Sequence, residues 1–305
     1  MVNKRKDIES QQHFSVGKKR LTFAIIISVL VMVIEIVGWS LSNSLALLSD
    51  AGHVLTDVLT LALGLLAIRF AERAHTSSMT YGFHRAEILA ALANGVSLIG
   101  IALYIFYEAF LRFFHPPEVQ APILLGFAVL ALLANIGTAK LLLSVRVSSL
   151  NLHAAFLHVA GDTLGSLGVV LGGIILYFTG ITVVDPIIAA IIGCFILKNA
   201  VDVTVQSATV LLEGVPSEID LQKLTQELLA VPGVQGVHEL HVWCIASGFH
   251  ALTGHVTIED QKLSQAQIIL DRITELLREK FSIMHVTLQP EVAQVIAIDR
   301  EKNLG

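Results

Sequence analysis

The sequence predicts an α-helical membrane protein in which six transmembrane helices precede a small α+β domain. The first observation behind this prediction is composition, since 54% of the 305 residues are hydrophobic, only 15% are charged, and the mean hydropathy is +0.73. Soluble domains carry about 25% charged residues, so this chain belongs among membrane proteins. The second observation is a change in pattern near residue 213, after which charged residues recur at helical spacing between Pro and Gly.

Six hydrophobic segments are long enough to cross a bilayer, which takes about 20 residues of helix. They cover residues 21–41, 45–70, 86–112, 122–144, 153–179 and 186–210. The first segment follows Lys18, Lys19 and Arg20 and is longer than the core of a cleavable signal peptide, which has about 7–15 residues. We therefore expect it to remain in the protein as a helix.

Positive residues indicate the orientation of these helices. Lys and Arg are concentrated before the first segment and between segments two and three and segments four and five, whereas the opposite loops offer mainly Arg112. Cytoplasmic loops are enriched in such residues, so both termini are predicted to be cytoplasmic. The predicted domains are a cytoplasmic N-terminal segment at 1–20, a six-helix transmembrane domain at 21–212 and a cytoplasmic C-terminal domain at 213–305. Nothing in this distribution of charge favours nucleic acid as a partner.

The residues after 213 predict the order helix, strand, strand, helix, strand. The first helix lies within 213–233, the strands at 234–247 and 249–260, the second helix at 264–281 and the last strand at 285–293. A small sheet with both helices on one face fits this order. At roughly 90 residues the domain can fold, and dimerisation would stabilise it further.

Two of the hydrophobic segments each carry a histidine and an aspartate four residues apart. His53 and Asp57 lie in the second segment, and His158 and Asp162 lie in the fifth. Residues at i and i+4 share one helix face, so each pair projects in a single direction. Ionisable residues inside a membrane are costly and usually functional. Two such faces opposed would supply the four nitrogen and oxygen ligands that Zn²⁺ binds tetrahedrally at about 2 Å.

The charges of this predicted site balance those of a dication. Two aspartates contribute two negative charges, and a zinc ion neutralises them. Metal binding requires neutral imidazoles and ionised carboxylates, so metal and protons compete for the same atoms. A hydrogen bond between helices is the alternative explanation for such a pair, but it accounts less well for two pairs that are both flanked by small residues.

At these residues the chain resembles the cation diffusion facilitator family. The segments that carry the resemblance, in order, are LALLSDAGHVLTD, TYGFHRAEILAAL, HAAFLHVAGDTLGSLGVVL, DPIIAAIIG and GVHELHVW. The resemblance implies a homodimer that exports divalent metal from the cytoplasm in exchange for protons, with His53, Asp57, His158 and Asp162 as its transport site. It also implies a ferredoxin-like, metallochaperone-like fold for the C-terminal domain. Histidine at position 53 resembles the zinc-preferring members, while cadmium and cobalt remain open.

The resemblance also implies a second metal site in the C-terminal domain. His238, His255, Gln289 and Glu291 align with positions that bind metal at the dimer interface of relatives. Alternate side chains of a strand share one face, so residues on neighbouring strands can converge there. We therefore expect a regulatory Zn²⁺ at this site, with the glutamine as a weaker ligand than histidine.

The loop at 71–87 offers a further but incomplete set of ligands. It contains His75 and His84, with Phe83 where some bacterial relatives carry a ligand, so whether it binds metal stays open. Arg85 is expected to form an ion pair with Glu213, as a related pair does in the family.

The sequence also predicts the positions or contacts of four other polar residues in the hydrophobic segments. Glu35 and Glu108 are expected near helix ends, where a long side chain reaches the membrane interface, and a role in a proton or ion path is the alternative for both. Asp50 is expected to cap the start of the second helix. Asn135 is expected to form a hydrogen bond with a neighbouring helix.

Two other classes of function fit fewer of these features. An intramembrane metalloenzyme needs an open coordination position and a general base, whereas four ligands would close the site, and the sequence contains no HExxH motif. A membrane-anchored metal sensor would not need polar pairs in two separate spans. We therefore expect a secondary transporter of Zn²⁺ and protons in the lipid bilayer. A bacterial plasma membrane is expected, because the chain lacks the long histidine-rich loop or targeting extension found in many organelle relatives.

Overall fold

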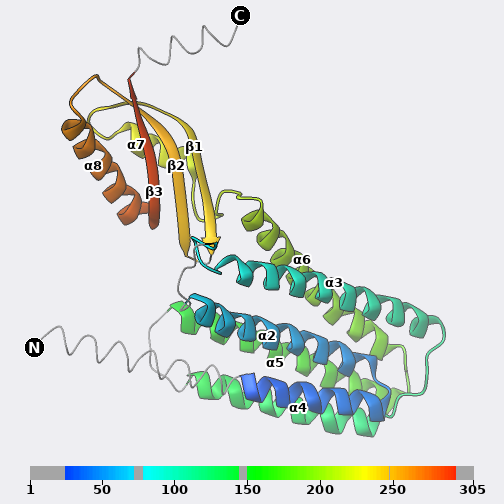
Figure 1. Ribbon diagram of the computed structural model, residues 1–305. Coiled ribbons are helices and arrows are strands. Elements are labelled where there is room, and N and C mark those ends of the chain that lie inside the picture. Colours follow the sequence, from blue (N-terminus) through cyan, green and yellow to red (C-terminus); the bar gives the residue numbers. More distant parts are fainter. Residues whose placement is uncertain (1–24, 72–77, 144–149, 247, 293–305) are drawn as a thin grey trace, which may run out of the picture. The chain divides into compact units, whose positions relative to one another are not determined.

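The computed structural model describes residues 25–71, 78–143, 150–246 and 248–292 (Figure 1). The chain forms two compact units, one of Met1–Ile68 with Ala91–Thr204 and one of Arg69–Ala90 with Val205–Gly305. The predicted N-terminal segment at 1–20 lies outside the described residues.

Six long helices occupy the predicted hydrophobic segments. They are Ile25–Ser42, α2 (Leu45–Ala71), α3 (Arg85–Phe114), α4 (Ala121–Leu143), α5 (Leu150–Thr179) and α6 (Val184–Leu211). By length and composition, all of them except α2 could cross a membrane. The 27 residues of α2 extend about 40 Å, which is also sufficient. The predicted α-helical membrane domain is therefore confirmed.

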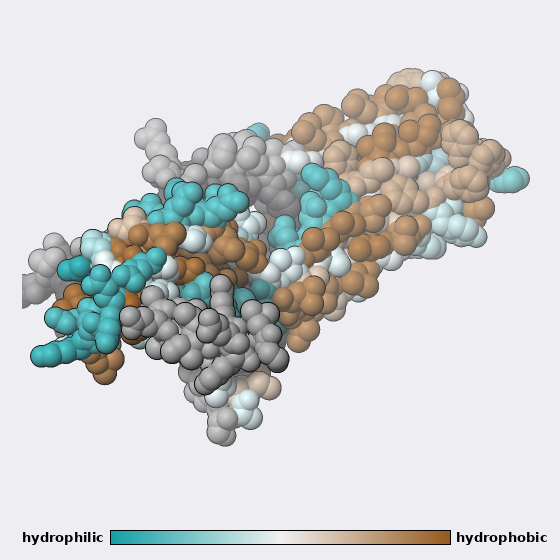
Figure 2. All heavy atoms as spheres, turned by 90° about the horizontal axis from the view of Figure 1, so that it is seen from above, coloured by the Kyte–Doolittle hydropathy of each residue, from teal (hydrophilic) through white to brown (hydrophobic). Residues whose placement is uncertain are grey.

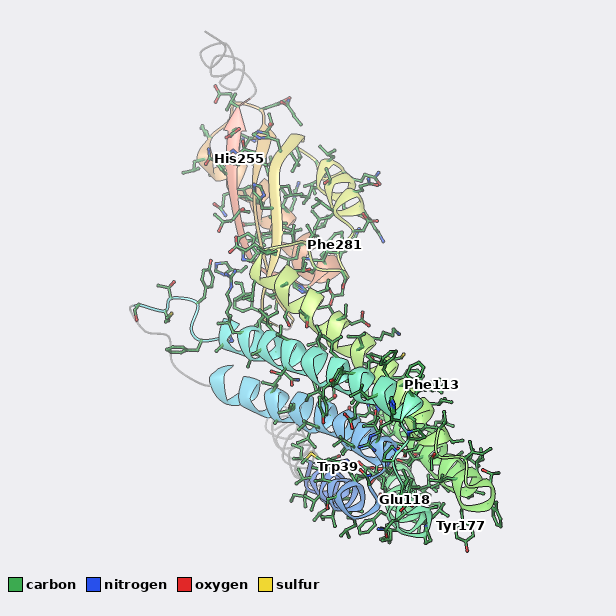
Figure 3. The ribbon with its side chains drawn as sticks, turned by 90° about the vertical axis from the view of Figure 1, so that its right-hand side faces the viewer. Trp39, Phe113, Glu118, Tyr177, His255 and Phe281 are labelled. Atoms are coloured by element: carbon green, nitrogen blue, oxygen red, sulfur yellow. The ribbon has the colours of Figure 1, made fainter. Side chains whose placement is uncertain are left out.

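The outer surfaces of these helices suit a lipid environment. Large hydrophobic side chains such as Leu103, Tyr107 and Phe178 are exposed on them, and Figure 2 shows a mostly hydrophobic surface over this unit. The aromatic residues Trp39, Phe113 and Tyr177 lie toward one end of the helices (Figure 3). Aromatic side chains are enriched where membrane helices meet the interface.

The start of α2 is capped by a residue of another helix. The Asp185 carboxylate, at the start of α6, accepts hydrogen bonds from the Ser44 hydroxyl at 2.5 Å and from the backbone N–H groups of Leu45 at 2.7 Å and Ala46 at 3.2 Å. The first N–H groups of a helix lack partners within it, so a buried carboxylate there both satisfies them and complements the helix dipole. This contact fixes the start of α2 against α6.

The expectation that Asp50 caps α2 is therefore wrong. Asp50 lies one turn inside the helix, is 2% exposed and accepts a hydrogen bond from the Ser166 hydroxyl on α5 at 3.0 Å. The Asn135 side chain on α4 donates to the same hydroxyl at 3.0 Å, which confirms the expected bond from Asn135 to a neighbouring helix.

The expectation for Glu35 is also wrong. Its side chain is 0% exposed and does not reach a helix end. Val31, one turn earlier on the same face, packs against Val54 of α2 and Ala131 of α4 in a buried cluster. Because this face of the helix turns inward, Glu35 is carried into the interior. Glu108 does lie near the end of α3, where it pairs with Arg112 at 3.0 Å.

Glycines allow two close contacts between helices. A Cβ atom on Gly38 would lie 2.7 Å from the Cβ of Phe127 on α4, and one on Gly95 of α3 would lie 3.2 Å from the Ala200 carbonyl oxygen of α6. Small residues at such crossings let membrane helices pack backbone against backbone.

The C-terminal domain has the predicted order of elements. They are α7 (Leu221–Leu229), β1 (Val234–Ala246), β2 (Phe249–Ile258), α8 (Leu263–Phe281) and β3 (Ile283–Val292). The strands form one sheet in the order β1-β2-β3, with β1 and β2 antiparallel and β2 and β3 parallel. Parallel neighbours require a crossover, and α8 provides it.

Both helices of this domain cover the same face of the sheet. Leu224 and Leu228 of α7 and Ile273 and Leu277 of α8 are fully buried in one core with strand residues such as Ile283. Side chains alternate along a strand, so the polar residues of the strands fall on the opposite face. The predicted arrangement of two helices on one face of a sheet is confirmed.

Candidate metal-binding sites

Helices α2 and α5 bring three of the predicted transport residues together, and we name this group the membrane site. His53, Asp57 and Asp162 each offer a ligand atom, and these atoms all lie within 4.8 Å of one another. Asp57 is 8% exposed and the other two are partly buried. The fourth predicted residue, His158, lies in α5 one turn before Asp162, and its side chain lies outside the described residues.

The spacing of two of these atoms already matches a shared zinc ion. The Nε2 atom of His53 lies 3.3 Å from the Oδ1 atom of Asp162. Two atoms that each lie about 2.0 Å from a tetrahedral zinc are separated by about 3.3 Å. Asp162 Oδ1 is buried and makes no well-formed hydrogen bond among the described residues, although His53 Nε2 lies 3.3 Å away. A buried carboxylate oxygen without a partner is costly, and a bound cation would satisfy it.

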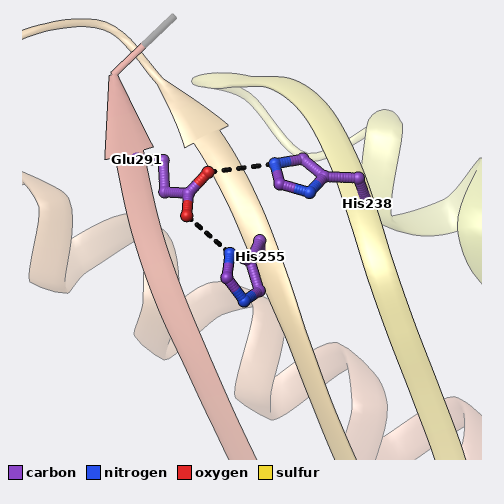
Figure 4. Close-up of side chains that lie close together, drawn as sticks. All are labelled: His238, His255 and Glu291. Carbon is purple, nitrogen blue, oxygen red and sulfur yellow. Dashed lines mark hydrogen bonds and ion pairs between the residues drawn. The ribbon is translucent and has the colours of Figure 1, made fainter. Parts of the chain in front are cut away.

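The strands of the C-terminal domain form a second group, which we name the sheet site (Figure 4). His238 of β1 is paired directly with His255 of β2, and His255 is paired with Gln289 of β3. The Glu291 carboxylate lies between the two imidazoles, 3.0 Å from His238 Nε2 and 2.5 Å from His255 Nδ1. Ligand atoms of these three residues lie within 4.8 Å of one another.

The remaining predicted residue of the sheet site supports the carboxylate. The side-chain amide of Gln289 donates a hydrogen bond to Glu291 Oε1 at 3.0 Å. The hydrogen bond from His255, with smaller contributions from the charges of His255 and His238, lowers the pKa of Glu291 below its usual value. Glu291 is therefore an ionised carboxylate at neutral pH, next to two imidazoles, and the three groups together could bind a metal ion.

Sequence reasoning missed one acidic neighbour of the sheet site. Glu239 Oε2 lies 3.6 Å from His255 Nε2. Strict alternation would place Glu239 on the opposite face from His238, but the pairing of β1 and β2 is irregular between His238 and His241, and Glu239 has a φ of 49°. A β-bulge redirects side chains in this way, and the sequence around residue 239 carries no signal for it.

The loop before α3 does not form a metal cluster in the described structure. Within the described ranges, the membrane site and the sheet site are the only groups of three or more His, Cys, Asp or Glu with converging ligand atoms. His84 packs its ring against Phe249, and His75 lies outside the described residues. The expected ion pair between Arg85 and Glu213 is confirmed at 2.9 Å.

Comparison with known proteins places these features in a family. Residues 21–212 match the family model described as the cation efflux transmembrane domain, and residues 216–293 match the cation efflux protein, cytoplasmic domain. The metal cation efflux system protein CzcD of Cupriavidus metallidurans is 41% identical over 93% of this chain and 90% of its own length.

Two further relatives cover a similar share of the chain. The cadmium, cobalt and zinc/H(+)-K(+) antiporter of Bacillus subtilis is 40% identical over 90% of this chain and 89% of its own. The zinc transporter ZitB of Escherichia coli is 38% identical over 94% of this chain and 91% of its own length. The solved metal-bound C-terminal domain of the CzcD transporter from Cupriavidus metallidurans is 37% identical and covers 24% of this chain and 99% of its own length, with a TM-score of 0.22.

A helical membrane domain that brings candidate metal ligands together, joined to a small α+β domain, fits a membrane transporter for metal cations. The chain belongs to the cation diffusion facilitator family. It is an integral membrane protein that carries out efflux of divalent metal cations, and the predicted class of secondary transporter, rather than enzyme, is confirmed.

Proposed function

We propose that this protein exports Zn²⁺ from the cytoplasm in exchange for protons, with the ion bound at the membrane site. The observation that carries the proposal is the convergence of His53, Asp57 and Asp162 from two helices. With His158 as the fourth ligand, the site holds two imidazoles and two carboxylates. Such a site is formally neutral when a dication is bound, which lowers the cost of placing it among membrane helices.

The ligand types favour zinc among the divalent metals. Imidazole nitrogen and carboxylate oxygen bind Zn²⁺ well in a tetrahedral site, and the 3.3 Å spacing of His53 and Asp162 suits that geometry. ZitB is named a zinc transporter, and the Bacillus relative is named for cadmium and cobalt as well as zinc. We therefore infer that zinc is the preferred substrate and that cadmium and cobalt compete with it.

Proton exchange follows from the protonation states that the ligands need. Zn²⁺ binds neutral imidazoles and ionised carboxylates, so loading the membrane site from the cytoplasm displaces protons from them. Once the helices rearrange to open the site outward, external protons compete for the same atoms and favour release of the metal. The presence of H⁺ in the name of the Bacillus relative fits this exchange.

The assembly and orientation belong to the same proposal. We infer a homodimer in a bacterial plasma membrane, with both termini in the cytoplasm and a division into 1–20, 21–212 and 213–305. A second zinc ion at the sheet site, held by His238, His255 and Glu291 with Gln289 beside them, would regulate transport by favouring one arrangement of the dimer. A ligand shifts such an equilibrium only through different affinities for the two arrangements.

The direct test is zinc uptake by proteoliposomes whose lumen is more acidic than the bath. The parent should take up zinc at a rate that rises with the pH gradient, and Asp57→Ala and Asp162→Ala should reduce uptake to that of empty vesicles. Asp202→Ala is the matched control, because Asp202 is an exposed residue of α6. Undiminished uptake by both site variants would refute the proposed site. Uptake by the parent that ignores the pH gradient would refute proton exchange.

A further inference from the structure

Two acidic residues outside the membrane site are buried together in the helical unit. The Glu35 side chain is 0% exposed, and neither of its carboxylate oxygens has a hydrogen-bond partner among the described residues. Asp50 of α2 is 2% exposed and lies close enough to Glu35 for the two carboxyl groups to interact. Neither residue is needed as a ligand at the membrane site. A buried ionised carboxylate without a partner is among the most expensive groups in a protein interior.

Helix packing explains why these two residues meet. Val31 and Val54 belong to one buried cluster, in which the helix Ile25–Ser42 contacts α2. Glu35 follows Val31 by one turn, and Asp50 precedes Val54 by one turn. Only two residues connect these helices, so they run antiparallel and both turns lie on the same side of the cluster. The two carboxyl groups therefore face the same interior space.

The polar groups around this pair do not neutralise its charge. Among the described residues, Asp162 of α5 also interacts electrostatically with Glu35, and Asp50 interacts with Glu35, His53 of α2 and Asp162. The Ser166 hydroxyl donates to Asp50 and itself accepts from Asn135. Among the described residues, the groups that act most strongly on Glu35 and Asp50 include no Lys or Arg.

The acidic groups of this region repel one another most strongly when no metal ion is bound. If Glu35, Asp50, Asp57 and Asp162 were all ionised, four negative charges would lie close together, and a bound dication would offset half of that charge. Like charges this close repel strongly in a water-poor interior, and a proton between two carboxyl groups removes the repulsion. A monovalent metal ion is a less suitable occupant, because such an ion is usually surrounded by a ring of oxygens, which the Ser166 hydroxyl and two carboxyl groups do not supply.

We propose that Glu35 and Asp50 form a proton-holding carboxyl pair beside the membrane site, which keeps a proton while no divalent cation is bound and releases it when one binds. The field of a bound dication favours the ionised pair, and loss of the metal favours its protonation. The pair thereby links metal loading to proton release through residues that do not ligate the metal. This inference rests on the proposed exchange of metal for protons and adds a proton site to it.

Proton release during zinc binding tests this pair directly. Purified full-length protein in weakly buffered detergent solution is titrated with Zn²⁺, and the protons released and the zinc bound are counted together. Glu35→Gln should bind as much zinc as the parent but release fewer protons, by up to about one for each zinc. Glu118→Gln is the matched control, because Glu118 is an exposed residue between α3 and α4 at the end of the helical unit (Figure 3). It should release as many protons as the parent.

Transport separates a proton role from a purely structural one. Glu35→Gln should slow zinc uptake driven by a pH gradient by about fivefold or more, the low end of typical couplings between two sites. It should leave the exchange of labelled for unlabelled zinc at equal pH near the parent rate, since that exchange needs no net proton movement. If Glu35→Gln slowed gradient-driven uptake and equal-pH exchange to the same extent, or left the number of protons released for each zinc unchanged, the proposed proton-holding role of the pair would be refuted. If transport by the parent required potassium and Glu35→Gln abolished that requirement, the proposed role of the pair in holding a proton would also be refuted.

Infrared difference spectroscopy provides a test that does not depend on one variant. In the parent, adding zinc to metal-free protein should remove a protonated carboxyl band, and this band should be absent in Glu35→Gln and altered in Asp50→Asn. A metal-free parent without any protonated carboxyl band would overturn the pair even if neither variant folds. A parent that exchanges no protons for zinc would instead refute the proposed function.

Discussion

Replacing Asp162 with asparagine removes one of the two carboxylates from the membrane site while keeping the size of the side chain. The structure places Asp162 Oδ1 3.3 Å from His53 Nε2, within 4.8 Å of a ligand atom of Asp57. With a dication bound, the variant site carries one net positive charge where the parent site is neutral. Zinc affinity should therefore fall steeply.

The size of this loss can be bounded from comparable sites. Removing a residue that only supports a metal ligand typically lowers affinity by about 10–100-fold. Asp162 supplies a ligand atom and half of the negative charge of the site, so its replacement should cost at least about 100-fold, or about 2.7 kcal/mol.

Equilibrium binding of zinc to the purified full-length chain measures this loss. Both the parent and Asp162→Asn would carry His238→Ala and His255→Ala, so that the sheet site does not contribute. Asp202→Asn makes the same chemical change at an exposed position of α6 and should keep the parent affinity. An affinity for Asp162→Asn within about threefold of the parent would refute the assignment of Asp162 as a ligand.

Three further predictions concern the fold. Asp185→Ala removes three hydrogen bonds at the start of α2 and should lower the free energy of unfolding by about 1–3 kcal/mol. A lower thermal midpoint of unfolding would show this loss, whereas an unchanged midpoint would show that Asp185 does not hold the start of α2. Because the pKa of Glu291 is lowered in the folded domain, Glu291 stabilises the fold above the unfolded pKa of about 4.3, and this contribution is lost as the pH falls. Glu291→Gln should remove that part of the pH dependence in unfolding experiments between neutral and acidic pH, whereas the exposed Glu279→Gln should keep it. Burial raises the pKa of Cys244, so its thiol should react with alkylating reagents only slowly until the domain unfolds, and rapid labelling of the folded protein would contradict this.

The sequence predicts the helices well because their signal is local. A long apolar segment must form a helix in a bilayer, since every backbone polar group needs a partner within the segment. His53 and Asp57 are four residues apart, so they lie on one face of their helix, and this follows from the local sequence alone. The strands of the C-terminal domain follow from alternation, which is also local.

The errors came from contacts between distant residues. The sequence shows that Glu35 and Asp50 lie in helices, but the face that each helix turns inward depends on packing partners such as Val54 and Ala131. The sequence predicts a cap at Asp50, because nothing near it in the chain reveals that Asp185 caps this helix. Glu239 approaches His255 only because the strand pairing shifts by a bulge.

The proposed transport depends on one zinc ion held between α2 and α5 by nitrogen and oxygen atoms. X-ray absorption at the zinc edge, on full-length protein carrying His238→Ala and His255→Ala and loaded with one equivalent of zinc, reports those neighbours directly. We predict four nitrogen or oxygen ligands at about 2.0 Å, two of them imidazoles, and loss of this spectrum in Asp162→Asn. A spectrum without imidazole neighbours, or one that Asp162→Asn leaves unchanged, would contradict the account.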